Sequence, residues 1–190
     1  VSTQYLANTF KDVAHKVLVA PNLLDLSMFP DVHSEIFDDG NGRKGKRYAI
    51  EVKLPVRVVW VGSETHKGDV EEITPALDEF LGKYCGVGTN QQATVLFSGM
   101  MPHGDLVRKY LHKGLFYQGM VPFASYHSIV SSLQPHVYLA PLADIPFNYG
   151  KSNLRVIEGW AMSAPSIASN VGEYRDTISH TVDGLVATSP

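Results

Sequence analysis

Four apolar runs rich in β-branched residues most constrain what this chain can fold into. They are residues 57–62 (RVVWVG), 93–99 (ATVLFSG), 136–142 (HVYLAPL) and 166–169 (SIAS), and a weaker run, 115–119 (LFYQG), lies between the second and the third. The strongest of them are continuously apolar rather than alternating, which is typical of strands buried on both faces. The sequence therefore predicts a parallel sheet that helices cover on both sides.

Segments with helical spacing separate these runs. They are residues 70–84, 105–113, 125–133 and 151–163. Acidic residues stand near the start of the first, where the helix dipole favours them, and the last ends before Pro165. Strands that alternate with helices indicate an α/β fold with a doubly wound, mostly parallel, Rossmann-like sheet. We expect its crossovers to be right-handed.

The first 47 residues have a different pattern. Residues 1–16 predict a strand end followed by a helix, residues 17–21 a short strand, and the Gly-rich residues 38–46 (DDGNGRKGK) a loop or hairpin tip. We interpret residues 1–47 as a linker and loop region, and residues 48–190 as the compact domain. The sequence begins without Met, with residues typical of the middle of a folded chain, so we expect it to be part of a larger protein.

The composition is that of a globular protein, with 44% hydrophobic and 18% charged residues and a net charge of −3. These values exclude a disordered chain and do not favour general nucleic-acid binding, which requires a basic face. No apolar run reaches the roughly 20 residues of a membrane span. Cys85 stands alone and cannot form an internal disulfide. Without a secretion signal, this predicts a reducing, cytoplasmic setting.

Ligands of open parallel sheets bind beyond the carboxyl ends of the strands, so the residues that follow each run are informative. Those at 143–152 (ADIPFNYGKS) are the richest. Gly150, Lys151 and Ser152 stand at a predicted helix start, where free N–H groups and a partial positive charge suit phosphate. Glu158 follows about 10 Å along that helix, within reach of the vicinal hydroxyls of a ribose.

Each of these residues also has an ordinary interpretation. Lys151 could be a solvated lysine, Glu158 a member of a structural ion pair, and His66 a loop cap. Gly-Lys-Ser is not a P-loop, because Ile145 occupies the place of the required glycine. The histidines and the single cysteine lack metal-ligand spacing, so we expect no metal site. The loop GSETHKG at 62–68 is not a dinucleotide fingerprint.

Several motifs together resemble the C-terminal, donor-binding half of a GT-B glycosyltransferase, closest to glycosyltransferase family 4. The ending 164–187 (APSIASNVGEYRDTISHTVDGLVA) and the Lys-Ser…Glu pattern within 136–159 are the more specific ones. Weaker similarities lie in the hinge-like segments 1–10 and 17–29, in 59–69 (VVWVGSETHKGD) and in 116–121 (FYQGMV). The resemblance thus extends over almost the whole chain.

The resemblance implies roles for individual residues. Gly62 and Ser63 correspond to a glycine loop near the phosphates, and His66, Lys67, Lys151 and Ser152 to groups that meet the diphosphate. Gly119, Met120 and Val121 correspond to the turn that meets the base, and Glu158 to the carboxylate that holds the ribose. Gly150 replaces a glutamate that touches the donor sugar in the family. We also count Asn148, in the loop before it, among the donor-binding residues.

The family implies metal-independent transfer of a sugar, with retention of configuration, from a nucleoside-diphosphate sugar to a glycan or other hydroxyl acceptor. No cofactor is implied beyond that donor. Lys151 and Glu158 would be the catalytic residues of this half, with Lys151 stabilising the diphosphate leaving group. Arg155, one helical turn further on, would either help or be solvated.

The missing parts of such an enzyme complete the expectation. The acceptor site and any peripheral contact with the inner face of a membrane would belong to an absent N-terminal domain, and further helices would follow the C-terminus. The role would be in polysaccharide biosynthesis, and the chain alone should bind donor weakly and transfer nothing. Two alternatives remain open at this point: a degenerate, non-catalytic GT-B-like binding module, and a nucleotide-sugar epimerase of the same fold.

Overall fold

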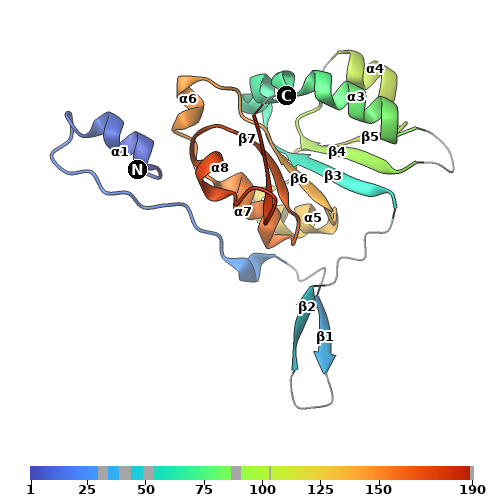
Figure 1. The fold of residues 1–190 in the computed structure, drawn as a ribbon, viewed down its shortest axis with the longest axis horizontal. Helices are drawn as coiled ribbons and strands as arrows, with labels where there is room; N and C mark the ends of the chain where they lie inside the picture. The colour runs from blue at the N-terminus through green and yellow to red at the C-terminus, as the bar shows by residue number, and fades with distance from the viewer. Residues whose placement is uncertain (30–33, 39–43, 49–53, 87–90, 103, 189–190) are drawn as a thin grey trace.

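The structure is a computed structural model that describes residues 1–29, 34–38, 44–48, 54–86, 91–102 and 104–188. Its centre is a six-stranded, entirely parallel sheet in the order β5-β4-β3-β6-β7-β8 (Figure 1). The strands are β3 (Val56–Val61), β4 (Ala93–Gly99), β5 (Leu115–Gly119), β6 (Val137–Ala140), β7 (Ser166–Ser169) and β8 (Gly184–Ala187). The predicted α/β class with a doubly wound parallel sheet is confirmed.

The strand order reverses once, between β3 and β6. From β3 the chain proceeds outward through β4 to β5, and from β6 it proceeds the other way through β7 to β8. The two central strands pair directly, with Val58 opposite Val137 and Val59 opposite Tyr138. The loops that leave these two strands therefore diverge, and a crevice is expected between them at the carboxyl edge of the sheet.

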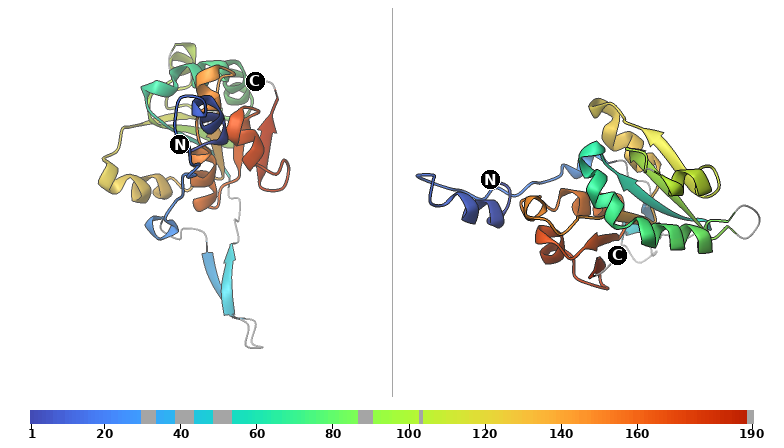
Figure 2. Two further views of the ribbon diagram at one scale, coloured as in Figure 1. Left: turned by 90° about the vertical axis from the view of Figure 1, so that its left-hand side faces the viewer. Right: turned by 90° about the horizontal axis from the view of Figure 1, so that it is seen from above.

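Helices lie on both faces of the sheet, as Figures 1 and 2 show. On one face, α2, α3 and α4 cover β3, β4 and β5 around Trp60, Val95 and Phe97. On the other, α5, α7 and α8 cover the sheet around Val59, Tyr138 and further apolar residues. The helices are α1 (Gln4–Phe10), α2 (Lys67–Glu72), α3 (Thr74–Tyr84), α4 (Asp105–Tyr110), α5 (Tyr126–Ser132), α6 (Pro146–Tyr149), α7 (Leu154–Ala161) and α8 (Gly172–Thr177), with the 3-10 turns η1 (Leu26–Met28), η2 (Glu64–His66) and η3 (Phe123–Ser125).

The helix predicted at 105–113 ends earlier, at Tyr110, and two other predicted helices differ more strongly from the structure. The helix expected at 70–84 is two helices, because Ile73 ends α2 and Pro75, which has no N–H to donate, stands in the first turn of α3. The helix expected to begin at Lys151 begins at Leu154 instead, after the N-cap Asn153. The reason is the unpredicted helix α6, whose last carbonyls accept from the N–H groups of residues 150 and 151.

The strand predicted at 17–21 does not form. This segment is extended, but it joins no ladder; Ala20 donates its backbone N–H to Val1, and no neighbouring strand completes the pairing. Residues Ser34–Asp38 and Lys44–Tyr48 form an antiparallel pair, β1 and β2, which stands clear of the main sheet in Figure 1. The turn predicted within 38–46 falls mostly on residues 39–43, outside the described residues.

The segment before the hairpin lies along the domain rather than apart from it. The ring of Tyr5 in α1 lies 5.8 Å from that of Tyr149, and Phe29 is buried in the core on the α5 and α7 side of the sheet. Between them, Asn22 donates a hydrogen bond to the hydroxyl of Ser152 at 2.7 Å. The segment thus reaches the loop that leads into α7. The division of the chain at residues 47 and 48 stays a prediction.

Candidate functional site

The strand-order reversal places two chemically rich segments side by side. One leaves β3 and contains Gly62, Ser63, the turn η2 and the start of α2; the other leaves β6 and contains α6 and the residues before α7. Contacts between residues more than 70 positions apart join them, including Ala143 to Asp69 and Lys151 to His66. The candidate site is therefore built at the reversal point of the sheet.

The carboxylate of Asp69 is the centre of this junction. One oxygen, Oδ1, accepts from the backbone N–H of Ala143 at 2.9 Å and from the side-chain amide of Asn148 at 2.6 Å. The other, Oδ2, lies 2.9 Å from the ammonium of Lys151 and 2.7 Å from Nδ1 of His66. Asp69 is only 4% exposed. A single buried carboxylate thus ties the loop after β3 to the loop after β6, to α6 and to the segment before α7.

These contacts decide the charge of Asp69. Burial by itself raises the pKa of this carboxyl, but the hydrogen bonds from His66 and Ala143 and the nearby Lys151 ammonium outweigh it, and the pKa is held well below its ordinary value. Asp69 is therefore an anion at neutral pH and accepts from all its partners. Lys151, with 20% of its side chain exposed, has one of its three protons directed at Asp69 and two left for another acceptor.

The partners of His66 assign its tautomer. Because ionised Asp69 can only accept, Nδ1 of His66 carries the proton that it donates. On the opposite side of the ring, Nε2 lies 3.2 Å from a guanidinium nitrogen of Arg155, which can only donate. Nε2 is therefore the acceptor in this arrangement, and Nδ1 carries the proton. The imidazole bridges Asp69 and Arg155 as an oriented relay of hydrogen bonds.

Arg155 is held by aromatic packing as well as by His66. The guanidinium carbon lies 5.5 Å from the centre of the Trp60 ring, and Trp60 is fully buried. This packing explains Gly62, because a Cβ there would stand 2.6 Å from Trp60 ring carbons and 3.2 Å from a guanidinium nitrogen. The solvated alternative for Arg155 is wrong, since its side chain is packed inside the junction beside the first glycine after β3.

One guanidinium nitrogen of Arg155, Nη1, is buried and has no hydrogen-bond partner among the described residues. A buried donor without an acceptor costs about 1–3 kcal/mol, so such groups are uncommon in folded proteins. Together with the two remaining protons of Lys151, this leaves unused donors on two cations that meet at His66. The junction is therefore suited to an anionic group.

Glu158 is a residue of α7, and its side chain contacts Tyr126 at the start of α5. Its two oxygens accept from the hydroxyls of Tyr126 at 3.2 Å and Tyr138 at 3.5 Å. Burial raises the pKa of Glu158, and the nearby positive charge of Arg155 together with the tyrosine hydroxyls offsets part of that rise. Burial also raises the pKa of both tyrosine hydroxyls, with the Glu158 charge adding to it. The carboxylate thus belongs to a buried polar cluster with Tyr126 of α5 and Tyr138 of β6.

The carboxyl ends of β3, β4 and β5 form one edge of the sheet. Gly62 donates its N–H to Ser98 at the end of β4, and Gly99 pairs with Gly119 at the end of β5. Since neighbouring strands are about 4.8 Å apart, Gly119 lies roughly 10 Å along the rim from Gly62. The residue after it, Met120, is 69% exposed. The predicted base-binding turn thus occupies the same edge as the Asp69 junction, two strands away.

The remaining predicted residues have other immediate partners. The Ser63 hydroxyl lies 2.8 Å from that of Thr65, and Lys67 is half-exposed beside Glu71, with 3.8 Å between their charged atoms. Ser152 accepts from Asn22. Asn148 is buried and donates to both Asp69 and the Ala143 carbonyl, which makes it a support of the junction.

Gly150 faces the N-terminal helix. A Cβ at this position would stand 3.0 Å from the end of the Leu6 side chain in α1, so a residue larger than glycine would require Leu6 to shift slightly.

Sequence reasoning missed the role of Asp69 and left that of Arg155 undecided. The available signal was local: His66 and Asp69 stand three residues apart around a helix start, where their side chains share one face. Nothing local connects them to Lys151, which is 82 residues from Asp69. That connection depends on the pairing of β3 with β6.

Among the residues that the structure describes, no three His, Cys, Asp or Glu side chains gather as a metal site would require. Within the same residues, no helix combines the length and the apolarity that a membrane crossing needs.

Comparisons with known proteins place the chain only distantly. No protein family and no curated protein matches it. Among solved structures it is similar to Anabaena Alr3699/HepE in complex with UDP-glucose, at 16% identity and a TM-score of 0.48, over 72% of this chain and 35% of that one. It is also similar to the lipopolysaccharide outer core galactosyltransferase WaaB, at 15% identity and a TM-score of 0.48, over 73% of this chain and 37% of that one. The chain thus spans about a third of the length of these structures.

Proposed function

We propose that this chain is the donor-binding half of a glycosyltransferase that takes its sugar from a nucleoside diphosphate. The observation that carries the proposal is the meeting of Lys151, Arg155 and His66 beside Gly62 at the reversal point of a parallel sheet. Crevices at such points are where α/β sheets bind nucleotides. The motif resemblance described for residues 59–69 and 136–187 supports the same function.

The diphosphate would lie between the loop after β3 and the segment before α7. There the two protons of Lys151 that do not point at Asp69 could contact its oxygens, and the Arg155 guanidinium behind His66 would add positive charge. The base would extend along the rim toward Gly119, Met120 and Val121, roughly 10 Å away by strand spacing. In this proposal Glu158, which accepts from the hydroxyl of Tyr126, would hold the hydroxyls of the ribose.

In this proposal the chain's own cations act on the leaving group. As the bond between sugar and phosphate breaks, the diphosphate gains negative charge, and donors already held in place by Asp69 and Trp60 stabilise it without reorganisation. Fixed positive charge would then perform what a metal ion does elsewhere, and transfer would occur with retention. The sugar would go to a hydroxyl of a glycan bound outside this chain, in polysaccharide synthesis.

The position of Gly150 bears on the donor sugar. This position is a glycine without a carboxylate of its own, and a Cβ here would stand 3.0 Å from the end of the Leu6 side chain. We therefore propose that the sugar is recognised by other groups, which leaves its identity open to a donor panel.

Calorimetric titration of the 190-residue chain tests the proposal. We expect nucleoside diphosphates such as UDP, GDP or ADP to bind more tightly than the corresponding nucleosides, because the phosphates provide the charge. Lys151→Ala should weaken diphosphate binding about 10- to 100-fold, as expected for a charged hydrogen bond worth about 1.5–3 kcal/mol. Its melting temperature, measured alongside, separates lost binding from lost folding.

The matched control is Lys113→Ala. Lys113 is exposed and precedes β5, so it lies at the amino edge of the sheet, opposite the candidate site. We expect this variant to bind like the wild type. Equal binding of nucleoside and nucleoside diphosphate, or equal losses in the two lysine variants, would contradict the proposal. A binding-only role would instead show as diphosphate binding without sugar transfer in a longer protein that contains both halves.

A further inference from the structure

The N-terminal segment of residues 1–22 contacts the end of α6 and the loop that follows it, which contains Lys151. The ring of Tyr5 in α1 lies 5.8 Å from that of Tyr149, and Figure 1 shows α1 beside α6. Further along the segment, the side-chain amide of Asn22 donates a hydrogen bond to the hydroxyl of Ser152 at 2.7 Å. The segment therefore reaches the candidate site and is more than a linker that leads past it.

The segment folds back on itself, and this fixes where Asn22 lies. The backbone N–H of Ala20 donates to the carbonyl of Val1 at 2.9 Å, so residues 1–20 form a closed turn that contains α1. Thr3 at the N-cap of α1 is buried, and its hydroxyl accepts from the backbone at the first turn of the helix. Asn22 is thus held beside Ser152 by more than its own hydrogen bond.

The hydrogen bond from Asn22 decides what the Ser152 hydroxyl can still do. A serine hydroxyl has one proton to donate and two lone pairs with which it accepts. Asn22 uses one lone pair, and no acceptor for the hydroxyl proton is found among the residues that the structure describes. Lys151, the residue before it, keeps two protons beyond the one directed at Asp69. These two neighbours in the chain therefore both retain protons for an anionic acceptor.

We propose that Asn22 is a positioning residue of the diphosphate site and that it acts through Ser152; this inference rests on the proposed function. Because the amide donates to the hydroxyl oxygen, the hydroxyl proton must point away from Asn22, where a phosphate oxygen can accept it. Lys151 contacts the diphosphate with its ammonium and Ser152 with its hydroxyl, while Asn22 does not touch the ligand. A hydroxyl that is already oriented loses less freedom when the ligand binds.

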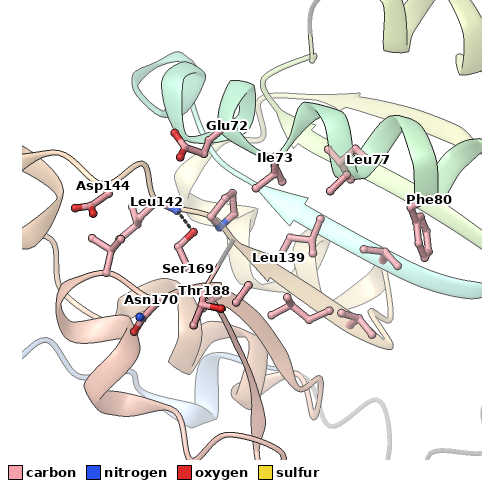
Figure 3. Close-up of a pocket in the computed structure, with 18 of the residues that line it drawn as sticks. Glu72, Ile73, Leu77, Phe80, Leu139, Leu142, Asp144, Ser169, Asn170 and Thr188 are labelled. Carbon is pink, nitrogen blue, oxygen red and sulfur yellow. Dashed lines mark hydrogen bonds between the residues drawn. The ribbon is translucent and has the colours of Figure 1, made fainter. Parts of the chain in front are cut away.

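Another hollow of the structure does not compete for this ligand. It has a volume of about 460 Å³ and lies beside α3 (Figure 3). The charged residues that line it are Glu72 and Asp144, and neither Lys151 nor Ser152 contributes to its lining. Two carboxylates repel a diphosphate, so binding of a diphosphate in solution should report on the site at Lys151.

A double-mutant cycle on the 190-residue chain tests the inference, with calorimetric titration of UDP, GDP and ADP and of the corresponding nucleosides. Asn22→Leu keeps the size of the side chain and removes its donor. We expect it to weaken diphosphate binding about three- to tenfold. Nucleoside binding should not change, because a nucleoside has no phosphate for Ser152 to meet. Ser152→Ala should weaken diphosphate binding about tenfold, and in that background Asn22→Leu should change the affinity by about twofold at most.

Asn8→Ala is the matched control. Asn8 is an exposed asparagine of α1, and its side chain accepts from Gln4 within the same helix, so the variant should bind like the wild type. Equal losses from Asn22→Leu with and without Ser152→Ala would overturn the inference, and so would a loss in Asn8→Ala as large as in Asn22→Leu.

The same titrations separate this inference from the proposed function. If Lys151→Ala weakens diphosphate binding and Asn22→Leu does not, the role of Asn22 is wrong and the proposed function stands. If the wild type binds nucleosides and nucleoside diphosphates equally, both are wrong. Melting temperatures of all variants, measured alongside, show whether a loss of binding comes from a loss of folding.

Discussion

The ammonium of Lys151 lies 2.9 Å from the carboxylate of Asp69, although 82 residues separate them in the chain. The same carboxylate also accepts from Ala143, Asn148 and His66. It therefore joins the two halves of the sheet at the point where the strand order reverses. The cation predicted to meet a diphosphate is thus held in place by a buried anion that no local pattern in the sequence connects to it.

Replacing Asp69 by Asn should destabilise the fold. The amide keeps the shape, but it removes the charge that pairs with Lys151 and offers a donor where only donors surround it. We expect the free energy of unfolding to fall by about 1–3 kcal/mol, measured by urea denaturation. Asp78→Asn, which breaks the half-exposed pair with Lys109, should change little. A similar small effect at both positions would show that the junction is not a structural centre.

The lowered pKa of Asp69 predicts how stability depends on pH. A carboxyl whose pKa is lower in the folded state contributes fully above the pKa of the unfolded chain, about 3.9, and loses that contribution as the pH falls through the folded value. The wild type should therefore lose stability below about pH 4. Asp69→Asn should show a shallower loss over the same acidic range in a series of denaturation curves. Parallel curves for the two proteins would contradict the lowered pKa.

Glu158 should act with the opposite sign. Because burial raises its pKa, its contribution to stability is greatest below the unfolded pKa of about 4.3 and declines as the pH rises through the higher folded value. Glu158→Gln keeps acceptors for Tyr126 and removes this decline, so the variant should gain stability relative to the wild type as the pH is raised from 4 to 7. Glu79→Gln, at an exposed position of α3, provides the carboxylate control and should follow the wild type. A constant difference between Glu158→Gln and the wild type at every pH would contradict the raised pKa.

Gly62 should tolerate no side chain. Its Cβ would stand 2.6 Å from carbons of the buried Trp60 ring and would press on Arg155, so Gly62→Ala should lower stability by about 1–3 kcal/mol and shift Trp60. Near-ultraviolet circular dichroism and urea denaturation measure the two effects. Gly68→Ala is the matched control, because no atom lies within 4 Å of the added carbon and alanine favours the helix α2. An unchanged Gly62→Ala protein would mean that Trp60 and Arg155 are free to move.

Much of the fold could be predicted because its signals are local. The apolar runs at 93–99, 115–119 and 166–169 became β4, β5 and β7 with the same bounds, since strands inside a parallel sheet are rich in apolar residues. The short helix α6 was missed, and with it the delayed start of α7. A helix of four residues has too few positions to show a helical period. Pro146 stands in its first turn, but a proline alone does not predict a helix.

The sequence by itself determined the class of fold, because buried parallel strands are continuously apolar and amphipathic helices repeat apolar residues at a helical period. It also supplied Lys151, Glu158 and the glycines after β3 and β5 as candidates, because polar groups after apolar strands collect at one edge. Only the tertiary structure decided that Asp69 anchors Lys151 and that Arg155 packs against Trp60 beside His66. Each of these depends on contacts between segments distant in the chain, and such contacts are set by strand order and register rather than by any local pattern.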